Sequence, residues 1–380
     1  MRDKLFETID SLYSEYIGFW ADVCNIESPT SHKAGVDAVS SYFAEKAKMK
    51  GWRVDVLPQD VAGDFVTITM NPNVTERPIS LSGHIDTVHP LGSFGSPAVR
   101  FDDKKIYGPG VTDCKGGIVA AFMAMDALDR CGFRARPIQL LLQVDEEHCL
   151  TNKYSIKYIA EQAKDAVAFF NLEGNSPGEI CIERKGIATF TFRVKGIEAH
   201  SSKCATSGAN AIHEAAYKIL ELEKIKDNDG LTCCCSVING GTVSNTVPGE
   251  CVFKANVRFA TSAQLEWITN FVNELAAKVY VKGCVTEVSR TGFRMAMEIC
   301  DRNLALVDEM NRIFEENGMD TLKPFRRTGG SDAADITAFG IPCVDSIGVS
   351  GGRIHSPEEF GDLDSLTLSA KRLAILSYNL

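Results

Sequence analysis

Histidine and carboxylate side chains occur at short spacings in several segments of the sequence, each next to an apolar run. In the first segment, His84-Ile85-Asp86, the histidine follows a predicted strand that begins at residues 79–81. Residues i and i+2 of an extended chain point to the same side, so Asp86 could accept a hydrogen bond from His84 and fix its tautomer. Metal-bound histidines are oriented by such partners. A structural histidine–aspartate pair at a strand end would have the same spacing, and this segment alone leaves both interpretations open.

A glycine-rich segment with one aspartate forms the second motif. Asp113 is preceded by Gly108 and Gly110 and followed by Gly116 and Gly117, at the start of a predicted helix. An aspartate at this position often caps a helix N-terminus. The glycines also allow a closer approach of the backbone than a cap requires. A carboxylate held at such a turn can bridge two metal ions, and we therefore treat Asp113 as a candidate ligand.

Three adjacent carboxylates, Asp145-Glu146-Glu147, follow the predicted strand 138–144. Acidic runs are common on protein surfaces, but neighbouring carboxylates repel one another unless something compensates for their charge. Consecutive residues of an extended chain project to opposite sides. Glu147 could therefore bind a metal while Glu146 accepts a proton from water.

Glu173 and His355 also follow predicted strands, at residues 166–172 and 343–347. A single glutamate or histidine in a loop usually has no role of this kind. All the candidates, however, stand just past a strand or at the start of a helix, which is where α/β sheets place their sites. The five candidate metal ligands are His84, Asp113, Glu147, Glu173 and His355.

The charge of these ligands indicates which cofactor they could hold. The three carboxylates carry three negative charges, and two divalent ions with a bridging hydroxide would make the set neutral. A mixture of imidazole and carboxylate ligands favours zinc, although cobalt or manganese would fit similar ligands. The predicted cofactor is therefore two Zn²⁺ ions, with Co²⁺ or Mn²⁺ as substitutes.

The patterns around these motifs predict an α/β protein. A chain of 380 residues exceeds the size at which one hydrophobic core usually stops growing. Strand-like and helix-like segments alternate, which predicts a mixed, largely parallel sheet with helices on both faces. The predicted helices are 4–25, 33–50, 115–131, 153–162, 304–317 and 364–378, and the strands are 52–57, 65–70, 79–83, 138–144, 166–172 and 343–347.

The pattern changes near Lys185. The segments that follow are a strand at 188–195, a helix at 209–222, strands at 231–239 and 251–259, a helix at 263–279 and a strand at 285–290. This order is typical of a ferredoxin-like α+β domain. We therefore expect a discontinuous metal-binding domain of residues 1–185 and 294–380, with residues 186–293 inserted into it.

Composition excludes some partners. The formal net charge of −10 argues against nucleic acid, which would need a basic surface. No segment approaches the roughly 20 apolar residues of a membrane span, so no membrane association is expected. The 13 cysteines include no CxxC pair, and three of them, residues 233–235, are consecutive. Reduced thiols, and hence a cytoplasmic location, are the prediction.

In these motifs, the sequence resembles the zinc metallopeptidase family of glutamate carboxypeptidase, acetylornithine deacetylase and succinyl-diaminopimelate desuccinylase. The resemblance covers nearly the whole chain and is strongest to glutamate carboxypeptidase, because Glu173 stands where the deacetylases commonly have aspartate. Cys114 stands where a variable small or polar residue is expected, and we interpret it as tolerated rather than as a ligand. The matching segments are 84–86, 110–117, 145–147, 171–173, 243–248, 256–258, 327–333 and His355.

The resemblance implies a role for each candidate residue. His84 and Glu173 would hold one zinc, Glu147 and His355 the other, and Asp113 would bridge them. Asp86 would orient His84, and Glu146 would be the general base.

The resemblance also implies that the insert 186–293 is a lid and dimerisation domain. His200 would reach the active site of the partner subunit of a homodimer and help to hold the oxyanion. The residues assigned to substrate binding are Asn245, Arg258, Arg294 and Gly330, although the residues flanking Arg294 differ from the family pattern. Taken without the resemblance, His200 could be a surface histidine and Arg258 could belong to a structural ion pair.

The predicted function is hydrolysis of an amide bond next to a free carboxylate in a small peptide or N-acyl amino acid, with Glu146 acting on a water that bridges two zinc ions. An N-acyl amino acid deacylase on the same scaffold would share the carboxylate pocket. An aminopeptidase or tripeptidase would need an acidic group for the substrate ammonium, and the sequence offers no clear candidate. A catalytically silent dimeric binding protein would need a broken metal set, whereas this chain keeps every expected position.

Overall fold

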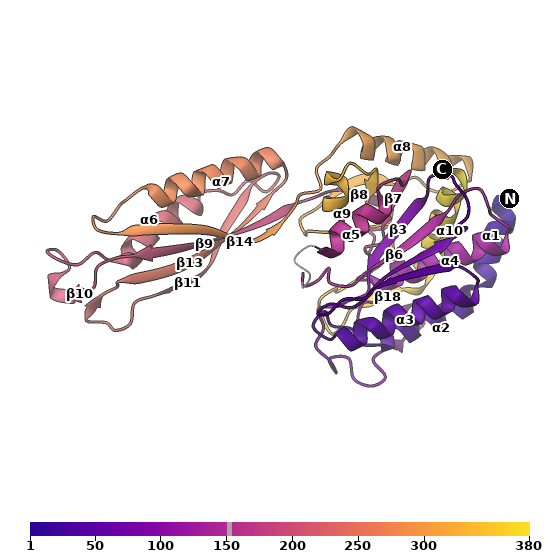
Figure 1. Ribbon diagram of the computed structural model, residues 1–380, viewed down its shortest axis with the longest axis horizontal. Coiled ribbons are helices and arrows are strands. Elements are labelled where there is room, and N and C mark those ends of the chain that lie inside the picture. Colours follow the sequence, from indigo (N-terminus) through magenta and orange to yellow (C-terminus); the bar gives the residue numbers. More distant parts are fainter. Residues whose placement is uncertain (150–153) are drawn as a thin grey trace. The chain divides into compact units, whose positions relative to one another are not determined.

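The computed structural model describes residues 1–149 and 154–380, and the chain divides into two compact units. The first unit consists of Met1–Ile182, Ile299–Arg326 and Asp335–Leu380, and the second of Glu183–Glu298 and Arg327–Ala334. The segment 186–293 lies within the second unit. Figure 1 labels many of the elements of both units.

The elements follow the predicted alternation, with several short strands added. The helices are α1 (Arg2–Ser11), α2 (Tyr13–Asn25), α3 (Lys33–Met49), α4 (Lys115–Arg130), α5 (Tyr154–Ala163), α6 (Ala211–Leu222), α7 (Ser262–Ala277), α8 (Asp301–Glu316), α9 (Ala333–Ala338), α10 (Leu363–Asn379) and the 3₁₀ turn η1 (Ser201–Lys203). The strands are β1 (Arg53–Leu57), β2 (Phe65–Met70), β3 (Ile79–His84), β4 (Arg100–Phe101), β5 (Lys105–Tyr107), β6 (Ile138–Gln143), β7 (Ala168–Asn171), β8 (Glu179–Arg184), β9 (Gly186–Lys195), β10 (Ala199–His200), β11 (Thr232–Gly240), β12 (Thr246–Val247), β13 (Glu250–Phe259), β14 (Val285–Arg294), β15 (Lys323–Arg327), β16 (Cys343–Val344), β17 (Gly351–Gly352) and β18 (Phe360–Asp362).

Two helix predictions need comment. The single helix predicted over residues 4–25 is wrong in one respect, because α1 and α2 meet at Leu12, which has φ −85° and ψ −8°. The helix predicted at 153–162 corresponds to α5, and its first predicted residue lies outside the described residues.

The central sheet of the first unit is mixed, with the order β1-β2-β6-β3-β7-β16. β2 runs antiparallel to both β1 and β6, whereas β6, β3, β7 and β16 are mutually parallel. Every residue of β2 and β3 is buried, as expected for strands with both faces covered. The predicted α/β class, with a mixed and largely parallel sheet, is confirmed.

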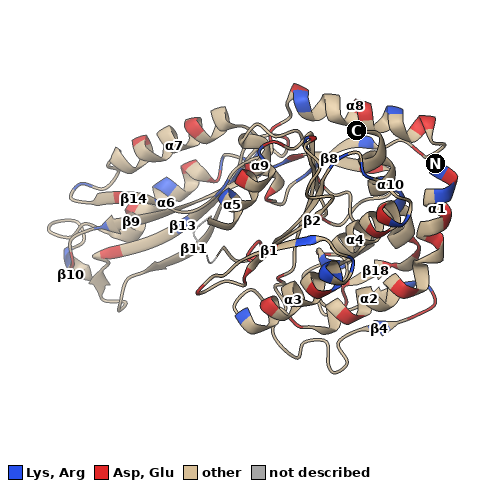
Figure 2. Cartoon of the chain, turned by 45° about the vertical axis from the view of Figure 1, so that its right-hand side comes forward, with Lys and Arg blue, Asp and Glu red and all other residues tan. Residues whose placement is uncertain are grey.

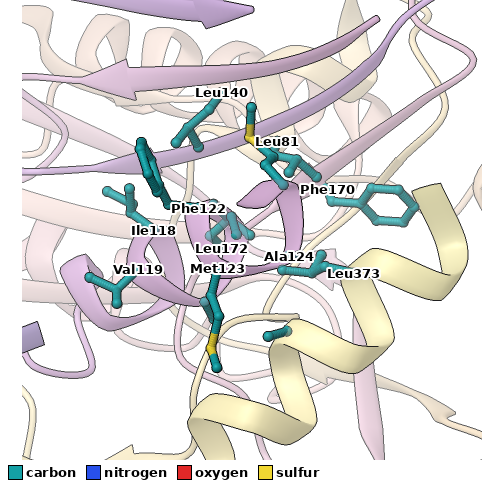
Figure 3. Packing of buried hydrophobic residues seen from close by; sticks show 14 of the residues in the cluster. Leu81, Ile118, Val119, Phe122, Met123, Ala124, Leu140, Phe170, Leu172 and Leu373 are labelled. Atoms are coloured by element: carbon teal, nitrogen blue, oxygen red, sulfur yellow. The ribbon is translucent and has the colours of Figure 1, made fainter. Parts of the chain in front are cut away.

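The core of the first unit forms around α4. Its residues from Lys115 to Leu128 are all buried, because α4 packs against β3 and β6 as well as against α2 and α10. Figure 3 shows how side chains from α4, the strands and α10 meet in this core. The residues labelled there include Ile118, Phe122, Leu81, Leu140 and Leu373.

The second unit has the ferredoxin-like order β9-α6-β11-β13-α7-β14. Its sheet has the order β11-β13-β9-β14, and all neighbours are antiparallel. Alternate residues of β9 and β13 are buried, and Phe192 stacks on Phe253 with ring centroids 4.6 Å apart. Both helices lie on this apolar face of the sheet (Figure 1), so the opposite face presents polar side chains.

Charged residues of both signs occur along α8, whereas the charged residues of α7 are both glutamates (Figure 2). Within the described parts of the chain, we find no helix with the length and apolar character that crossing a lipid bilayer requires. All 13 cysteines lie in described segments, and none forms a disulfide.

Candidate metal centre

Three parallel strands of the first unit place candidate ligands at one edge of the sheet. His84 is the last residue of β3, Glu147 follows β6, and Glu173 follows β7. β3 lies between β6 and β7 in the sheet. Because the carboxyl ends of parallel strands meet at the same edge, residues 84, 147 and 173 are brought together although they are far apart in the sequence.

Asp113 faces both candidate histidines. Its Oδ1 lies 3.0 Å from Nε2 of His84, and its Oδ2 lies 3.2 Å from Nε2 of His355. Nε2 of His84 is also 3.6 Å from Oε1 of Glu173, and Nε2 of His355 is 3.4 Å from Oε2 of Glu147. The structure therefore brings the five candidate ligands together, with Asp113 in the middle and one histidine and one glutamate on each side.

The donor set suits divalent metal ions. Ligand atoms of His84, Asp113 and Glu147 all lie within 4.8 Å of one another, as do those of His84, Cys114 and Glu173. Imidazole and carboxylate groups at such distances are typical of zinc and related sites. His84 is 2% exposed and Asp113 is 7% exposed, so water competes little for these groups.

The pKa values of these groups reflect their close approach. Burial alone would lower the pKa of His84, but its contacts with Cys114, Asp113 and Asp86 raise it well above its ordinary value. Hydrogen bonds to Asp113 and Glu147 raise the pKa of His355 to about 10.

The carboxylates respond in opposite ways. Burial would raise the pKa of Asp113, yet the hydrogen bonds from His355 and His84 hold it far below its ordinary value. Burial raises the pKa of Glu147, and the hydrogen bond from His355 only partly offsets this rise. Without metal, the two histidines thus carry protons that neutralise the central carboxylate.

Asp86 is fully buried next to these ligands, but it contacts His84 differently from the prediction. Nδ1 of His84 lies 3.0 Å from the main-chain oxygen of Asp86 and 3.5 Å from its carboxylate Oδ1. The carboxylate accepts hydrogen bonds from the hydroxyl of Thr30 (2.6 Å) and from the main-chain N–H groups of Glu146 and Glu147 (both 3.2 Å). The main-chain oxygen of Asp86 is thus nearer to the His84 ring than its carboxylate, which also binds the acidic segment.

Cys114, interpreted from the sequence as a tolerated residue, lies next to the candidate ligands His84 and Glu173. It is fully buried, its Sγ accepts a hydrogen bond from the main-chain N–H of His84 (3.1 Å), and its thiol faces the carbonyl of the same residue (3.5 Å). Burial raises the pKa of this thiol to about 12. A neutral thiol engaged with the backbone favours a structural role over metal binding.

Two buried charged residues next to the centre were not identified from the sequence. Nζ of Lys115 donates hydrogen bonds to the carbonyl groups of Val23 (3.2 Å) and Ile26 (2.8 Å), near the end of α2. The carboxylate of Glu359, which is 0% exposed, accepts hydrogen bonds from the segment before Asp113. Lys115 lies within the glycine-rich motif around Asp113, and this position could have identified it. No pattern in the sequence links Glu359 to residue 113.

The remaining predicted site residues belong to the second unit and form two groups. His200 and Asn245 are exposed and adjacent, because β10 pairs with β12 and the main-chain N–H of Ser201 donates to the carbonyl of Asn245 (2.8 Å). Arg258 lies on β13, opposite Ile187 of β9. Arg294 also pairs with Ile187, and its side chain is adjacent to Gly330. The structure therefore gathers Arg258, Arg294 and Gly330 around one end of β9.

A model of peptidase family M20/M25/M40 matches residues 80–378 of the chain. Carboxypeptidase G2 from Pseudomonas sp. (strain RS-16) is 27% identical over 350 residues, which cover 90% of this chain and 83% of that protein. Succinyl-diaminopimelate desuccinylase from Herminiimonas arsenicoxydans is 26% identical over 324 residues, which cover 79% of this chain and 84% of that protein. Among solved structures, aminopeptidase PepT from Bacillus cereus ATCC 10987 has a TM-score of 0.79 at 21% identity, covering 96% of this chain and 97% of that chain.

These similarities and the ligand cluster make the chain a metal-dependent hydrolase. More specifically, it belongs to peptidase family M20/M25/M40, and the family resemblance inferred from its motifs is confirmed.

Proposed function

We propose that the chain hydrolyses an amide bond next to a free carboxylate, in a small peptide or an N-acyl amino acid, with two divalent metal ions. The observation that carries this proposal is the position of Asp113, whose two oxygens each face a different histidine. Zn²⁺ is the proposed metal, because the ligands are two imidazoles and three carboxylates. A relative named carboxypeptidase G2 supports this choice of reaction.

The proposed ligands divide into two sets that share Asp113. His84 and Glu173 would hold one ion, and Glu147 and His355 the other. Such a pair of ions lowers the pKa of water and polarises a carbonyl group. Glu146, which is 9% exposed and next to Glu147, would accept the proton of the attacking water and return it to the leaving amine.

Arg258 is the proposed group for the substrate carboxylate. Its guanidinium is half-buried, and burial lowers its pKa. Among the described residues, no carboxylate forms an ion pair with Arg258, which disfavours the structural ion pair that the sequence left open. A planar guanidinium can bind a carboxylate through two parallel hydrogen bonds. Arg294, Gly330 and Asn245 are proposed to assist.

A homodimer with shared active sites is also proposed, and the separation of the two groups in the second unit supports it. His200 belongs to β10, which pairs with β12 just before β13 starts at Glu250, whereas Arg258 is near the end of β13. The stretch from Glu250 to Arg258 spans about 27 Å, at roughly 3.4 Å per residue. A small substrate can contact both groups only when His200 comes from the partner subunit.

The surface of the second unit offers a place for such pairing. β11 is an edge strand whose residues Val237 and Ile238 are 44% and 52% exposed. The neighbouring helix α6 exposes Tyr217 and Leu220. Unpaired strand edges and exposed apolar groups favour association with another chain.

A cytoplasmic location is also proposed. It is supported by the cysteines, because none of the 13 forms a disulfide and several are buried. Reduced thiols are typical of proteins in the cytoplasm.

The proposed reaction can be tested by screening N-acyl amino acids and dipeptides with zinc-loaded protein, with Glu146→Gln as the inactive control. Peptides with a blocked N-terminus and a free C-terminal carboxylate should be cleaved. Preference for short N-acyl groups would indicate a deacylase. A requirement for a free amino group, with no effect of amidating the carboxylate, would contradict the proposal in favour of an aminopeptidase or tripeptidase. A protein that loads zinc but cleaves no member of the panel would point instead to the silent binding protein.

A further inference from the structure

Glu359 is a buried carboxylate that is not among the proposed metal ligands. It is 0% exposed and stands four residues after His355, immediately before β18. A buried carboxylate is unfavourable unless hydrogen bonds and charges compensate for its loss of hydration. The partners of Glu359 therefore indicate what it holds in place.

The glycine-rich segment that ends at Asp113 supplies most of these partners. Oε1 of Glu359 accepts hydrogen bonds from the main-chain N–H groups of Thr112 (2.9 Å) and Asp113 (3.0 Å), and Oε2 accepts one from Gly110 (3.2 Å). Gly110 has φ +74°, a conformation that glycine adopts readily and that turns its N–H inward. Thr112 also donates its hydroxyl hydrogen to the carbonyl of Phe360 (2.6 Å). The segment 110–113 is thus folded around a single side chain.

The same carboxylate contacts the segment that follows His84. Oε2 of Glu359 lies 2.9 Å from Nε2 of His89, a histidine that is 6% exposed and packs edge-on against Phe94. Main-chain and side-chain contacts of Glu359 therefore connect the segment 84–89, the segment 108–113 and the segment 355–360. Each of these segments carries one proposed metal ligand.

We propose that Glu359 is a positioning residue for the metal centre, acting through the backbone of Asp113. It holds the main chain of residues 110–113 so that each oxygen of Asp113 faces one histidine before any metal binds. His89 supports Glu359 by donating to its second oxygen. This inference rests on the proposed metal-dependent function, and it adds a residue whose side chain touches neither metal nor substrate.

The competing explanation is a carboxylate that contributes only to folding stability. Hydrogen bonds to a charged acceptor are stronger than neutral ones, so either role would destabilise the protein when Glu359 is changed. Only a positioning role would alter the geometry and affinity of the bound metal. Partners of metal ligands typically change metal affinity about 10- to 100-fold when they are removed.

The test compares Glu359→Gln with Glu358→Gln. Glutamine keeps the shape of Glu359, but its NH₂ group cannot accept the main-chain N–H groups that one of the two carboxylate oxygens accepts. Glu358 is the matched control, because it is an exposed neighbour that pairs with Arg353 on the surface. The measurements are Co²⁺ and Zn²⁺ affinity by competition with a chelator, the absorption spectrum of the Co²⁺ protein, and kcat at saturating metal.

The expected result for Glu359→Gln is a loss of metal affinity of about 10- to 100-fold, a changed Co²⁺ spectrum and a lower kcat, with Glu358→Gln like the unmodified protein. A folded Glu359→Gln protein with the original affinity and spectrum would overturn the inference. Failure of the unmodified protein to bind two metal ions would overturn both this inference and the proposed function.

If Glu359→Gln does not fold, hydrogen exchange of the unmodified protein decides. The amides of Thr112 and Asp113 should exchange slowly in the metal-free protein, because Glu359 already binds them. Rapid exchange that slows only after metal is added would show that the metal, and not Glu359, orders the segment.

Discussion

The candidate metal centre of the first unit and the arginine-containing surface of the second present charge in opposite ways. In the first, each charged group has protein partners: Asp113 faces two histidines, and Asp86 accepts three hydrogen bonds. In the second, Arg258 lies on the polar face of an antiparallel sheet and has no carboxylate partner among the described residues. The charges of the first region are balanced by groups of the chain itself, whereas the charge of Arg258 is available to an anionic ligand.

This difference follows from what each region has to do. Metal ligands must be fixed before the ions arrive, because the geometry of the site determines the chemistry. A half-buried arginine with no partner is unfavourable in the free protein, and this cost can be recovered when an anion binds. Substitutions in the first region should therefore mainly lower kcat, whereas substitutions in the second should mainly raise KM.

The largest effect is expected for Glu146→Gln. Loss of a general base typically lowers the rate about 10²- to 10⁴-fold, and Glu146 is proposed to transfer the proton without binding metal. kcat should fall by this factor while the metal content stays at two ions per chain, as measured by elemental analysis. Loss of metal together with activity would place Glu146 among the ligands and remove it as the base.

A smaller loss is expected for His200→Ala, because removal of one oxyanion donor lowers kcat about 10²- to 10³-fold. The separation of His200 from Arg258 leads to a sharper test. Mixed dimers of His200→Ala and Glu146→Gln chains contain one site with both intact residues. Activity should therefore reappear on mixing and subunit exchange. Two inactive proteins that stay inactive in a demonstrated mixed dimer would show that His200 does not act across subunits.

For Arg258→Ala, the expected change lies in KM. A hydrogen-bonded charge pair contributes about 1.5–3 kcal/mol, which corresponds to a rise in KM of about 10- to 150-fold for substrates with a free carboxylate. kcat should change much less. Arg258→Lys is the control, since it keeps the charge and loses the paired geometry. An equal KM for free and amidated substrates in the unmodified protein would remove Arg258 from the pocket.

The sequence was informative where local pattern determines position. Apolar runs marked β3, β6 and β7, and the convergence of His84, Glu147 and Glu173 follows once those strands lie parallel. The ferredoxin-like order of the second unit was also readable, because its strands alternate between buried and polar residues.

Other features depend on contacts between distant segments, which no local pattern records. His355 reaches Asp113 from a loop in which Arg353 and His355 both have positive φ, a conformation that neither residue type favours. β4, β17 and β18 have two or three residues each, too few to show a period. The partners of Glu359 lie nearly 250 positions away in the sequence. Sequence patterns therefore indicated the ligands better than the groups that hold them.

Metal affinity should depend on pH, by about tenfold per pH unit for each proton displaced. In the metal-free protein the pKa of His355 is raised to about 10 and that of His84 is also raised, so both are protonated at neutral pH. A histidine must lose its proton to bind metal. Affinity should thus rise with pH until about pH 10, where His355 is half deprotonated.

Calorimetric titration of Zn²⁺ in buffers with different ionisation enthalpies would count the released protons. His213→Ala is a suitable control, because His213 is an exposed histidine of α6 and is not among the proposed ligands. Binding without proton release between about pH 6 and pH 8 would contradict the proposed role of the two histidines, because the pKa of His355 is raised to about 10 and that of His84 is also raised.

The smallest effect on catalysis is expected for Cys114. Its Sγ accepts the main-chain N–H of His84, and β3 passes so close that a Cβ on Gly83 would lie 2.9 Å from this sulfur. Cys114→Ala would leave that buried N–H without an acceptor, which costs about 1–3 kcal/mol of folding stability. Metal affinity should change only a few-fold. Cys114→Ser, which keeps an acceptor, should lose less stability.

The Co²⁺ spectrum distinguishes this structural role from ligation. A thiolate bound to cobalt gives an intense charge-transfer absorption in the near ultraviolet, whereas nitrogen and oxygen ligands give only weak bands. If Cys114 remains a neutral thiol, as its pKa of about 12 indicates, the unmodified protein and Cys114→Ser should have the same spectrum. An intense band that disappears in Cys114→Ser would make Cys114 a ligand together with His84 and Glu173. The proposed carboxylate-bridged centre would then also include a sulfur ligand, which would compete with the carboxylates for one of the metal ions.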